Sequence, residues 1–173
     1  MKSSESTANG QEVPPSVVTK LTVLGATGSI GINTLEIVRQ FPHKFKIEAL
    51  SCRSSIECLV EQIKEFQPRL VCVDNSEQAS ELRETFRDRN SGIVTEFVWG
   101  VEGLIKISSD PEVDLVVAGI VGAAGLQPTY SAVQAGKTVA VANKEPLVMA
   151  GELFVQTANK TGAKLLPTDS EHN

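Results

Sequence analysis

The chain has 173 residues, of which 41% are hydrophobic and 21% are charged, and this composition is typical of a folded globular domain. A formal net charge of −5 with scattered Lys and Arg disfavours nucleic-acid binding, which usually needs a basic patch. No apolar run reaches the roughly 18 residues of a membrane span, because glycines interrupt the longest one, at 114–126.

Residues 1–16 are rich in Ser, Glu, Asn and Pro, and we expect them to form a disordered lead-in, because this composition cannot build a core. They lack the apolar segment of a secretory signal, and they contain acids but no Arg, unlike a transit peptide. A polar lead-in still leans towards a plastid protein, with the bacterial cytoplasm as the alternative. The three cysteines, Cys52, Cys58 and Cys72, form no Cys-x-x-Cys pair and are expected to be reduced thiols.

Short β-branched runs then alternate with longer periodic runs. Strands are predicted over 20–24, 45–51, 70–73, 93–98, 114–118, 138–142 and 164–166. Helices are predicted over 28–40, from a cap at Ser54 or Ser55 to near Pro68, and from a cap at Asn75 or Ser76 to about residue 87. Further helices are predicted over 101–108, 126–135 and 146–160, and the last two are expected to end at Gly136 and Gly162. This alternation predicts an α/β fold with a Rossmann-like, doubly wound, mostly parallel sheet and helices on both faces. We expect residues 17–167 to form this domain and residues 168–173 to begin a second, catalytic domain.

The motif GATGSIG, residues 25–31, joins the first predicted strand to the first predicted helix, and we call it the phosphate loop. Glycine at Gly25 suits a tight turn, the missing side chain at Gly28 lets backbone N–H groups approach a pyrophosphate, and Gly31 allows close packing of the helix. The N-terminus of the helix then offers its free N–H groups to the anion. The strand before and the helix after the glycines predict a dinucleotide site.

The segment after the second predicted strand decides between NAD and NADP. An NAD site usually has an acid there for the ribose 2′-hydroxyl, but this chain has Arg53, Ser54 and Ser55, which we call the 2′-phosphate segment. The Arg cation and the two hydroxyls would bind a 2′-phosphate, which a carboxylate would repel. The residues therefore favour NADPH, with a solvated arginine and a plain helix cap as the alternative.

Two further polar segments follow predicted strands in the second half of the chain. Asn143, Lys144 and Glu145 follow the strand over 138–142, and Asp169 and Glu171 follow the last one. Residues i and i+2 of an extended segment point the same way, so the last two carboxylates would converge. Such oxygen ligands suit Mg²⁺ or Mn²⁺. A surface ion pair and a solvated acidic turn are the alternatives.

The ordered motifs GATGSIG, GIVGAAGL, ANKE and PTDSEHN make the chain resemble the 1-deoxy-D-xylulose 5-phosphate reductoisomerase family over about residues 20–173. The resemblance implies an NADPH- and metal-dependent oxidoreductase of non-mevalonate isoprenoid biosynthesis. Such an enzyme isomerises and reduces 1-deoxy-D-xylulose 5-phosphate, a small phosphorylated sugar, to 2-C-methyl-D-erythritol 4-phosphate. The resemblance also implies a homodimer and inhibition by fosmidomycin.

The resemblance assigns roles to the matching positions. It gives the NADPH phosphates to Thr27, Gly28, Ser29 and Ile30, further cofactor contacts to Asn143 and Glu145, substrate contacts to Lys144 and Ser170, and the Mg²⁺ or Mn²⁺ ion to Asp169 and Glu171. The 2′-phosphate segment departs from the family pattern of a small residue, Lys or Ser, and Asn. The third metal carboxylate, the lid and the substrate-phosphate residues would lie beyond Asn173, so we expect a fragment that binds NADPH and is inactive alone.

Two other interpretations stay open on the residues. Another NADP-dependent dehydrogenase, of the aspartate-semialdehyde or homoserine type, would not need paired carboxylates for a metal. A non-catalytic NADPH-binding module would have no use for Lys144 or for the carboxylates.

Overall fold

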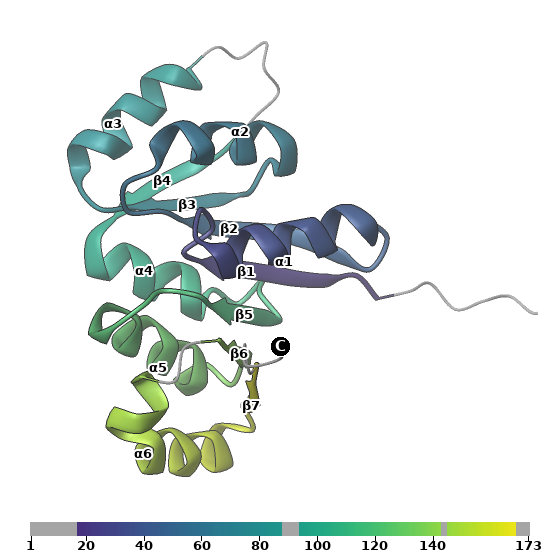
Figure 1. The fold of residues 1–173 in the computed structure, drawn as a ribbon, viewed down its shortest axis with the longest axis vertical. Helices are drawn as coiled ribbons and strands as arrows, with labels where there is room; N and C mark the ends of the chain where they lie inside the picture. Colours follow the sequence, from purple (N-terminus) through teal and green to yellow (C-terminus); the bar gives the residue numbers. More distant parts are fainter. Residues whose placement is uncertain (1–16, 88–93, 143–144, 169–173) are drawn as a thin grey trace, which may run out of the picture.

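One parallel sheet organises the part of the chain that the structure describes. The structure is a computed structural model that describes residues 17–87, 94–142 and 145–168, without the side chains of 145 and 146. Within these residues seven strands form the order β4-β3-β2-β1-β5-β6-β7, which Figure 1 shows from β4 near the top to β7 near the bottom. The strands are β1 (Thr19–Leu24), β2 (Phe45–Ser51), β3 (Leu70–Val73), β4 (Glu96–Trp99), β5 (Leu115–Ala118), β6 (Thr138–Val141) and β7 (Lys164–Pro167). Each neighbouring pair among them is parallel, which confirms the predicted Rossmann-like sheet.

Helices cover both faces of the sheet because the direction in which successive strands are added to it reverses once. The chain runs outward from β1 to β4 and then returns past β1 to β5, and right-handed crossovers on the two runs place helices on opposite faces. The helices are α1 (Ser29–Gln40), α2 (Ile56–Phe66), α3 (Ser76–Thr85), α4 (Gly100–Ser109), α5 (Leu126–Gln134) and α6 (Glu145–Thr161), with a short 3₁₀ turn, η2 (Ala123–Gly125). The first three share one apolar core and the last three share the other, as a doubly wound fold requires.

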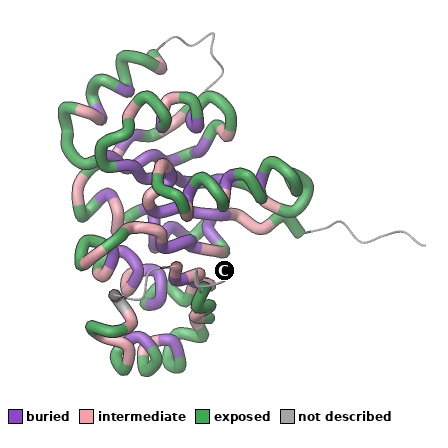
Figure 2. Tube along the Cα trace, in the orientation of Figure 1, coloured by how far each residue is buried: buried purple, intermediate pink, exposed green. Residues whose placement is uncertain are grey.

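Alternate residues of the strands supply these two cores. In β1, Leu21 and Val23 belong to the core under α1–α3, whereas Leu24 belongs to the core under α4–α6. In β3, Val71 faces the first core and Cys72 the second. Both faces are therefore buried, and Figure 2 shows the buried residues concentrated along the central strands. This explains why the strands are continuous apolar runs rather than alternating ones.

The ends of α3 and α5 follow the predicted caps, whereas α2 and α6 depart from the prediction. Asn75 caps α3 by accepting a hydrogen bond from the backbone N–H of Gln78, and Gly136 follows α5 with a φ of +73°. Ser55 occupies the N-cap position of α2, but its hydroxyl makes no cap hydrogen bond. Helix α6 is interrupted at Ala150, where φ is −145°, which the helical periodicity did not predict. No described helix is long and apolar enough to cross a membrane.

Ion pairs join the connections at the amino edge of the sheet, opposite the phosphate loop. Arg69 donates from Nη2 to Oδ1 of Asp110 at 2.6 Å, and its Nε lies 3.6 Å from Oε2 of buried Glu48. Glu48 stands where the register between β1 and β2 shifts, and it also accepts from Lys46. Burial opposes ionisation of Asp110, but the hydrogen bonds from Arg69 and from the backbone N–H of Glu112 outweigh it and lower the pKa of Asp110.

Candidate cofactor site

The phosphate loop lies at the carboxyl edge of the sheet, where the strand order reverses. Its strand, β1, has β2 on one side and β5 on the other, and such a reversal is where open α/β sheets bind nucleotides. Gly25 adopts a φ of +79°, a conformation that favours glycine. A Cβ on Gly31 would lie 2.4 Å from the carbonyl oxygen of Gly25, so only glycine lets α1 start this close to the loop. The structure therefore confirms the predicted tight turn at Gly25 and the predicted close packing of the helix at Gly31.

The N-terminus of α1 has the features of an anion site. Gly28 occupies the N-cap position, no side chain of the described residues caps it, and the first turn of α1 contains no acid. Gly28 and Ser29 are exposed, while Thr27 and Ile30 are half-buried. The first N–H groups of a helix lack intrahelical partners and carry partial positive charge. This end can therefore bind a pyrophosphate through backbone N–H groups.

The end of β2 holds the phosphate loop in place. Ser51 accepts hydrogen bonds from Gly25 N–H through its hydroxyl, at 2.9 Å, and from Ala26 N–H through its carbonyl, at 2.8 Å. The hydroxyl of Thr27 lies 3.3 Å from Sγ of Cys52. These contacts bring the phosphate loop beside the 2′-phosphate segment, which follows Cys52 directly. The structure thus places the two predicted phosphate-binding segments next to each other.

The side chains of the 2′-phosphate segment are exposed and make few interactions with the other described residues. The side chain of Arg53 is 85% exposed, and its Nε lies 3.8 Å from Oδ1 of Asp74, which is too long for a hydrogen bond. Ser54 and Ser55 are exposed, and Ser55 makes no cap bond. An Arg cation and two hydroxyls at this position suit a phosphate monoester.

The sequence prediction missed Asp74, the acid closest to this cation. Asp74 follows β3, and the prediction examined only the residues after β2 for an acid. Because β3 pairs with β2 in parallel, both strands end at the same edge, and this adjacency was the signal that could have identified Asp74. Its carboxylate partly offsets the charge of Arg53. The thiol of Cys72, which is buried nearby, stays protonated at neutral pH, because burial and then the charge of Asp74 raise its pKa to about 12.

The glycine-rich segment after β5 borders the phosphate loop on its other side. Gly119 donates its N–H to the carbonyl of Leu24 at 3.0 Å, and a Cβ on Gly25 would lie 3.2 Å from the carbonyl oxygen of Gly119. Side chains at either position would separate the two segments. Val121 beyond this contact is 79% exposed. The segment therefore forms an open, small-residue wall beside the N-terminus of α1.

The remaining predicted site residues cannot be placed from the structure. Lying outside the described residues are Asn143, Lys144, Asp169, Ser170, Glu171 and the side chain of Glu145. Their described neighbours do meet at one edge, because Ala142 N–H bonds to Ala118 and Thr168 N–H bonds to Val141 at 3.0 Å. Among the described residues, no group of three or more His, Cys, Asp or Glu side chains could hold a metal ion. The metal and substrate roles stay predictions.

Comparison with known proteins agrees with this arrangement. The family model described as 1-deoxy-D-xylulose 5-phosphate reductoisomerase matches residues 21–151. A protein of that name from Dechloromonas aromatica (strain RCB) is 53% identical over 153 residues. The match covers 88% of this chain and 38% of the relative, so the chain spans well under half the length of the relative.

Solved structures give the same result. A crystal structure of DOX-P reductoisomerase in complex with magnesium has a TM-score of 0.84 and 47% identity, covering 90% of this chain and 38% of that chain. Another, in complex with NADPH, fosmidomycin and magnesium, has a TM-score of 0.82 and 47% identity, covering 87% of this chain and 36% of that chain. A homoserine dehydrogenase from Archaeoglobus fulgidus is only 18% identical, with a TM-score of 0.53, and shares the fold alone.

Proposed function

Because the chain belongs to the 1-deoxy-D-xylulose 5-phosphate reductoisomerase family, we propose that it supplies the NADPH-binding part of such an enzyme. The observation that carries this proposal is the uncapped, acid-free N-terminus of α1 beside the exposed Arg53, Ser54 and Ser55. A backbone anion site and a cationic segment side by side match the pyrophosphate, which NADPH shares with NADH, and the 2′-phosphate, which only NADPH has.

The described residues fit the cofactor in three respects. The N–H groups at Ser29 and Ile30 begin α1 and can hold the pyrophosphate, and the exposed Gly28 leaves space for it. Arg53 can bind the 2′-phosphate, and the loop after β5 offers a small-residue surface near Gly119. When bound, NADPH supplies the hydride of the reaction, and the protein supplies orientation.

The substrate and metal parts of the proposal rest on the family. We expect the complete enzyme to isomerise and reduce 1-deoxy-D-xylulose 5-phosphate to 2-C-methyl-D-erythritol 4-phosphate. Asp169 and Glu171 would bind Mg²⁺ or Mn²⁺, while Lys144 and Ser170 would contact the substrate. The structures named for complexes with magnesium and with fosmidomycin support a metal and a small-molecule ligand in the complete enzyme.

The assembly and the compartment belong to the same proposal. We expect a homodimer of the complete enzyme. The plastid expectation drawn from residues 1–16 gains no support, since the relative named above is bacterial, and a bacterial cytoplasm is the better-supported compartment.

The test is an assay of a complete protein that contains this chain, which should oxidise NADPH only when both the substrate and Mn²⁺ are present. Asp169→Asn keeps the shape of the side chain but removes its charge, so the Mn²⁺ concentration for half-maximal rate should rise, by about tenfold or more. NADPH binding should stay unchanged and serves as the control. Normal turnover of this variant at limiting Mn²⁺ would show that Asp169 is not a metal ligand.

A further inference from the structure

Two glutamines on neighbouring helices each hold one of the two cofactor-binding segments. Gln62 of α2 donates from Nε2 to the carbonyl of Ala26 in the phosphate loop, at 3.0 Å. Gln78 of α3 donates from Nε2 to the carbonyl of Arg53 in the 2′-phosphate segment, at 3.1 Å. Both side chains donate to backbone carbonyls of the two proposed phosphate-binding segments.

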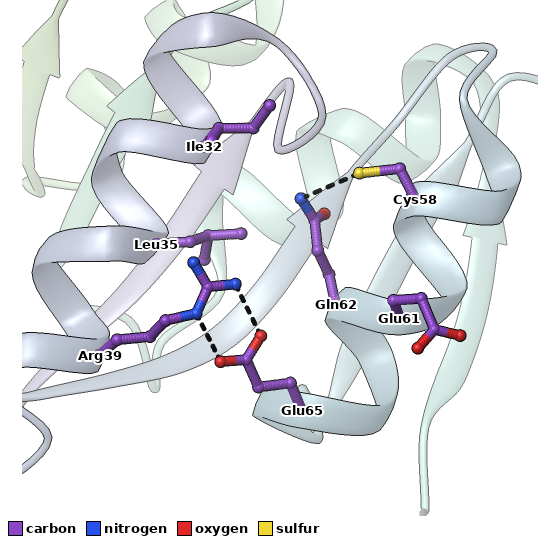
Figure 3. Close-up of a pocket in the computed structure, with 7 residues that line it drawn as sticks. All are labelled: Ile32, Leu35, Arg39, Cys58, Glu61, Gln62 and Glu65. Carbon is purple, nitrogen blue, oxygen red and sulfur yellow. Dashed lines mark hydrogen bonds and ion pairs between the residues drawn. The ribbon is translucent and has the colours of Figure 1, made fainter.

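The side-chain amide of Gln62 is buried and donates to the phosphate loop instead of to water. The residue is 5% exposed, and its Oε1 is buried with no hydrogen-bond partner among the described residues. A buried acceptor without a partner costs roughly 1–3 kcal/mol, so the fold tolerates this cost while keeping the donor on Ala26. Among the described residues, the only other hydrogen bond of Nε2 is a long one, 3.7 Å to Sγ of Cys58, which Figure 3 shows in the cavity between α1 and α2.

Gln78 has a different but parallel arrangement. Its Oε1 accepts the backbone N–H of Asp74 at 3.0 Å while its Nε2 reaches Arg53, so one amide bridges the chain leaving β3 and the chain leaving β2. Its backbone N–H is fixed by the side chain of Asn75 at 3.0 Å. The amide therefore sets the distance between the Arg53 backbone and the neighbouring acid, Asp74.

From this geometry we propose that Gln62 and Gln78 are positioning residues with separate tasks. Gln62 orients the phosphate loop for the pyrophosphate, which NADPH and NADH share. Gln78 orients the 2′-phosphate segment, which only NADPH uses, and so sets the preference between the two cofactors. The proposal rests on the NADPH-binding function proposed above.

The test is a titration of this chain with NADPH and with NADH, followed by nicotinamide fluorescence, for three Gln→Met variants. Methionine has nearly the shape of glutamine but no N–H donor. Gln62→Met should raise the Kd for both cofactors by the same factor, about three- to tenfold, the equivalent of one lost hydrogen bond. Gln78→Met should raise the Kd for NADPH about threefold and leave that for NADH unchanged. Gln156→Met removes a glutamine whose side chain, among the described residues, bonds only to Glu152 of α6, and it should change neither Kd.

Thermal melting of each variant serves as the control that it is folded. Gln62→Met exchanges one unpaired buried oxygen, on the glutamine, for another, on Ala26, so its melting temperature should stay near that of the unmodified chain. Gln62→Asn keeps the amide but withdraws it by one methylene, and it gives a second measurement of the same loss. If folded variants at position 62 bind both cofactors normally, or if Gln78→Met weakens both alike, the proposal is overturned. If the unmodified chain binds no NADPH, the proposed function itself fails, and this inference fails with it.

Discussion

A side chain added at Gly28 of the phosphate loop should abolish cofactor binding with little loss of stability, whereas one added at Gly31 should lower stability. At Gly28 the backbone is extended, and a Cβ would meet only the carbonyl of Gly25 at 3.4 Å, an ordinary contact. We expect Gly28→Val to cost at most about 1 kcal/mol of stability, as an unfavourable N-cap residue does, yet to abolish NADPH binding because its methyl groups fill the pyrophosphate space. Thermal melting and an NADPH titration of one preparation measure both effects.

Gly31→Ala is the matched comparison. Its Cβ would lie 2.4 Å from the carbonyl oxygen of Gly25 and 2.5 Å from Cα of Ala26, both backbone atoms that cannot turn away. The variant should lose about 1–3 kcal/mol of unfolding free energy, the usual cost of overpacking. A Gly31→Ala protein as stable as the unmodified chain, or a folded Gly28→Val protein that still binds NADPH, would contradict the assigned loop geometry.

Charge at the 2′-phosphate segment gives a second prediction at the scale of residues. Arg53→Asp places a carboxylate where a 2′-phosphate would bind, so the affinity for NADPH should fall by about tenfold or more while that for NADH falls little. Asp74→Asn removes the acid 3.8 Å from Arg53 and should strengthen NADPH binding by about two- to threefold, since the pair is exposed and screened. Isothermal titration with both cofactors checks the two directions. Equal effects on NADPH and NADH binding would show that Arg53 does not recognise the 2′-phosphate.

Single elements were predicted best where local chemistry decides them. The cap at Asn75 and the glycine after α5 follow from side-chain and backbone preferences that act over a few residues. The interruption of α6 at Ala150 was not predicted, although Gly151, a poor helix former, follows directly, because the apolar periodicity continues through both residues. The contact between Asp74 and Arg53 depends on strand order, which periodicity alone does not give.

The amino edge of the sheet shows how connections between elements are stabilised by charge. Asp110 follows α4, is 8% exposed and accepts from Arg69, which precedes β3, so the pair ties two connections together. Asp110→Asn should lower the unfolding free energy at pH 7 by about 1.5–3 kcal/mol, the range for a charge-assisted hydrogen bond. NADPH binding should be unaffected, because the cofactor edge is opposite.

The pH dependence of this loss follows from the direction of the pKa shift. The folded pKa of Asp110 is lowered relative to its ordinary value of 3.8, so its contribution is complete well above pH 3.8 and disappears as the pH falls below it. Urea unfolding of the two proteins should therefore differ at pH 7 and converge in acid. A difference that persists unchanged below pH 3 would show that shape, and not charge, matters at this position.

At the scale of the whole molecule, the alternation of strands and helices was enough to predict the doubly wound sheet. The glycines of residues 25–31 were enough to predict the junction between β1 and α1, because a strand, a turn and a helix N-terminus follow one another in the chain. The roles of Gln62 and Gln78 were not predictable in this way, since each contacts a loop 25 or more residues away through a helix on the face of the sheet. Such contacts exist only once the sheet is assembled.

The central claim is that this chain is an NADPH-binding unit, and a direct titration tests it. Both proposed phosphate-binding segments belong to this chain, so the chain itself is the sample for the measurement. Nicotinamide fluorescence of NADPH should show saturable binding with one site per chain, and NADH should bind at least about tenfold more weakly, a difference of roughly 1.4 kcal/mol. No saturable NADPH binding by the folded chain, or NADH binding of equal strength, would contradict the account.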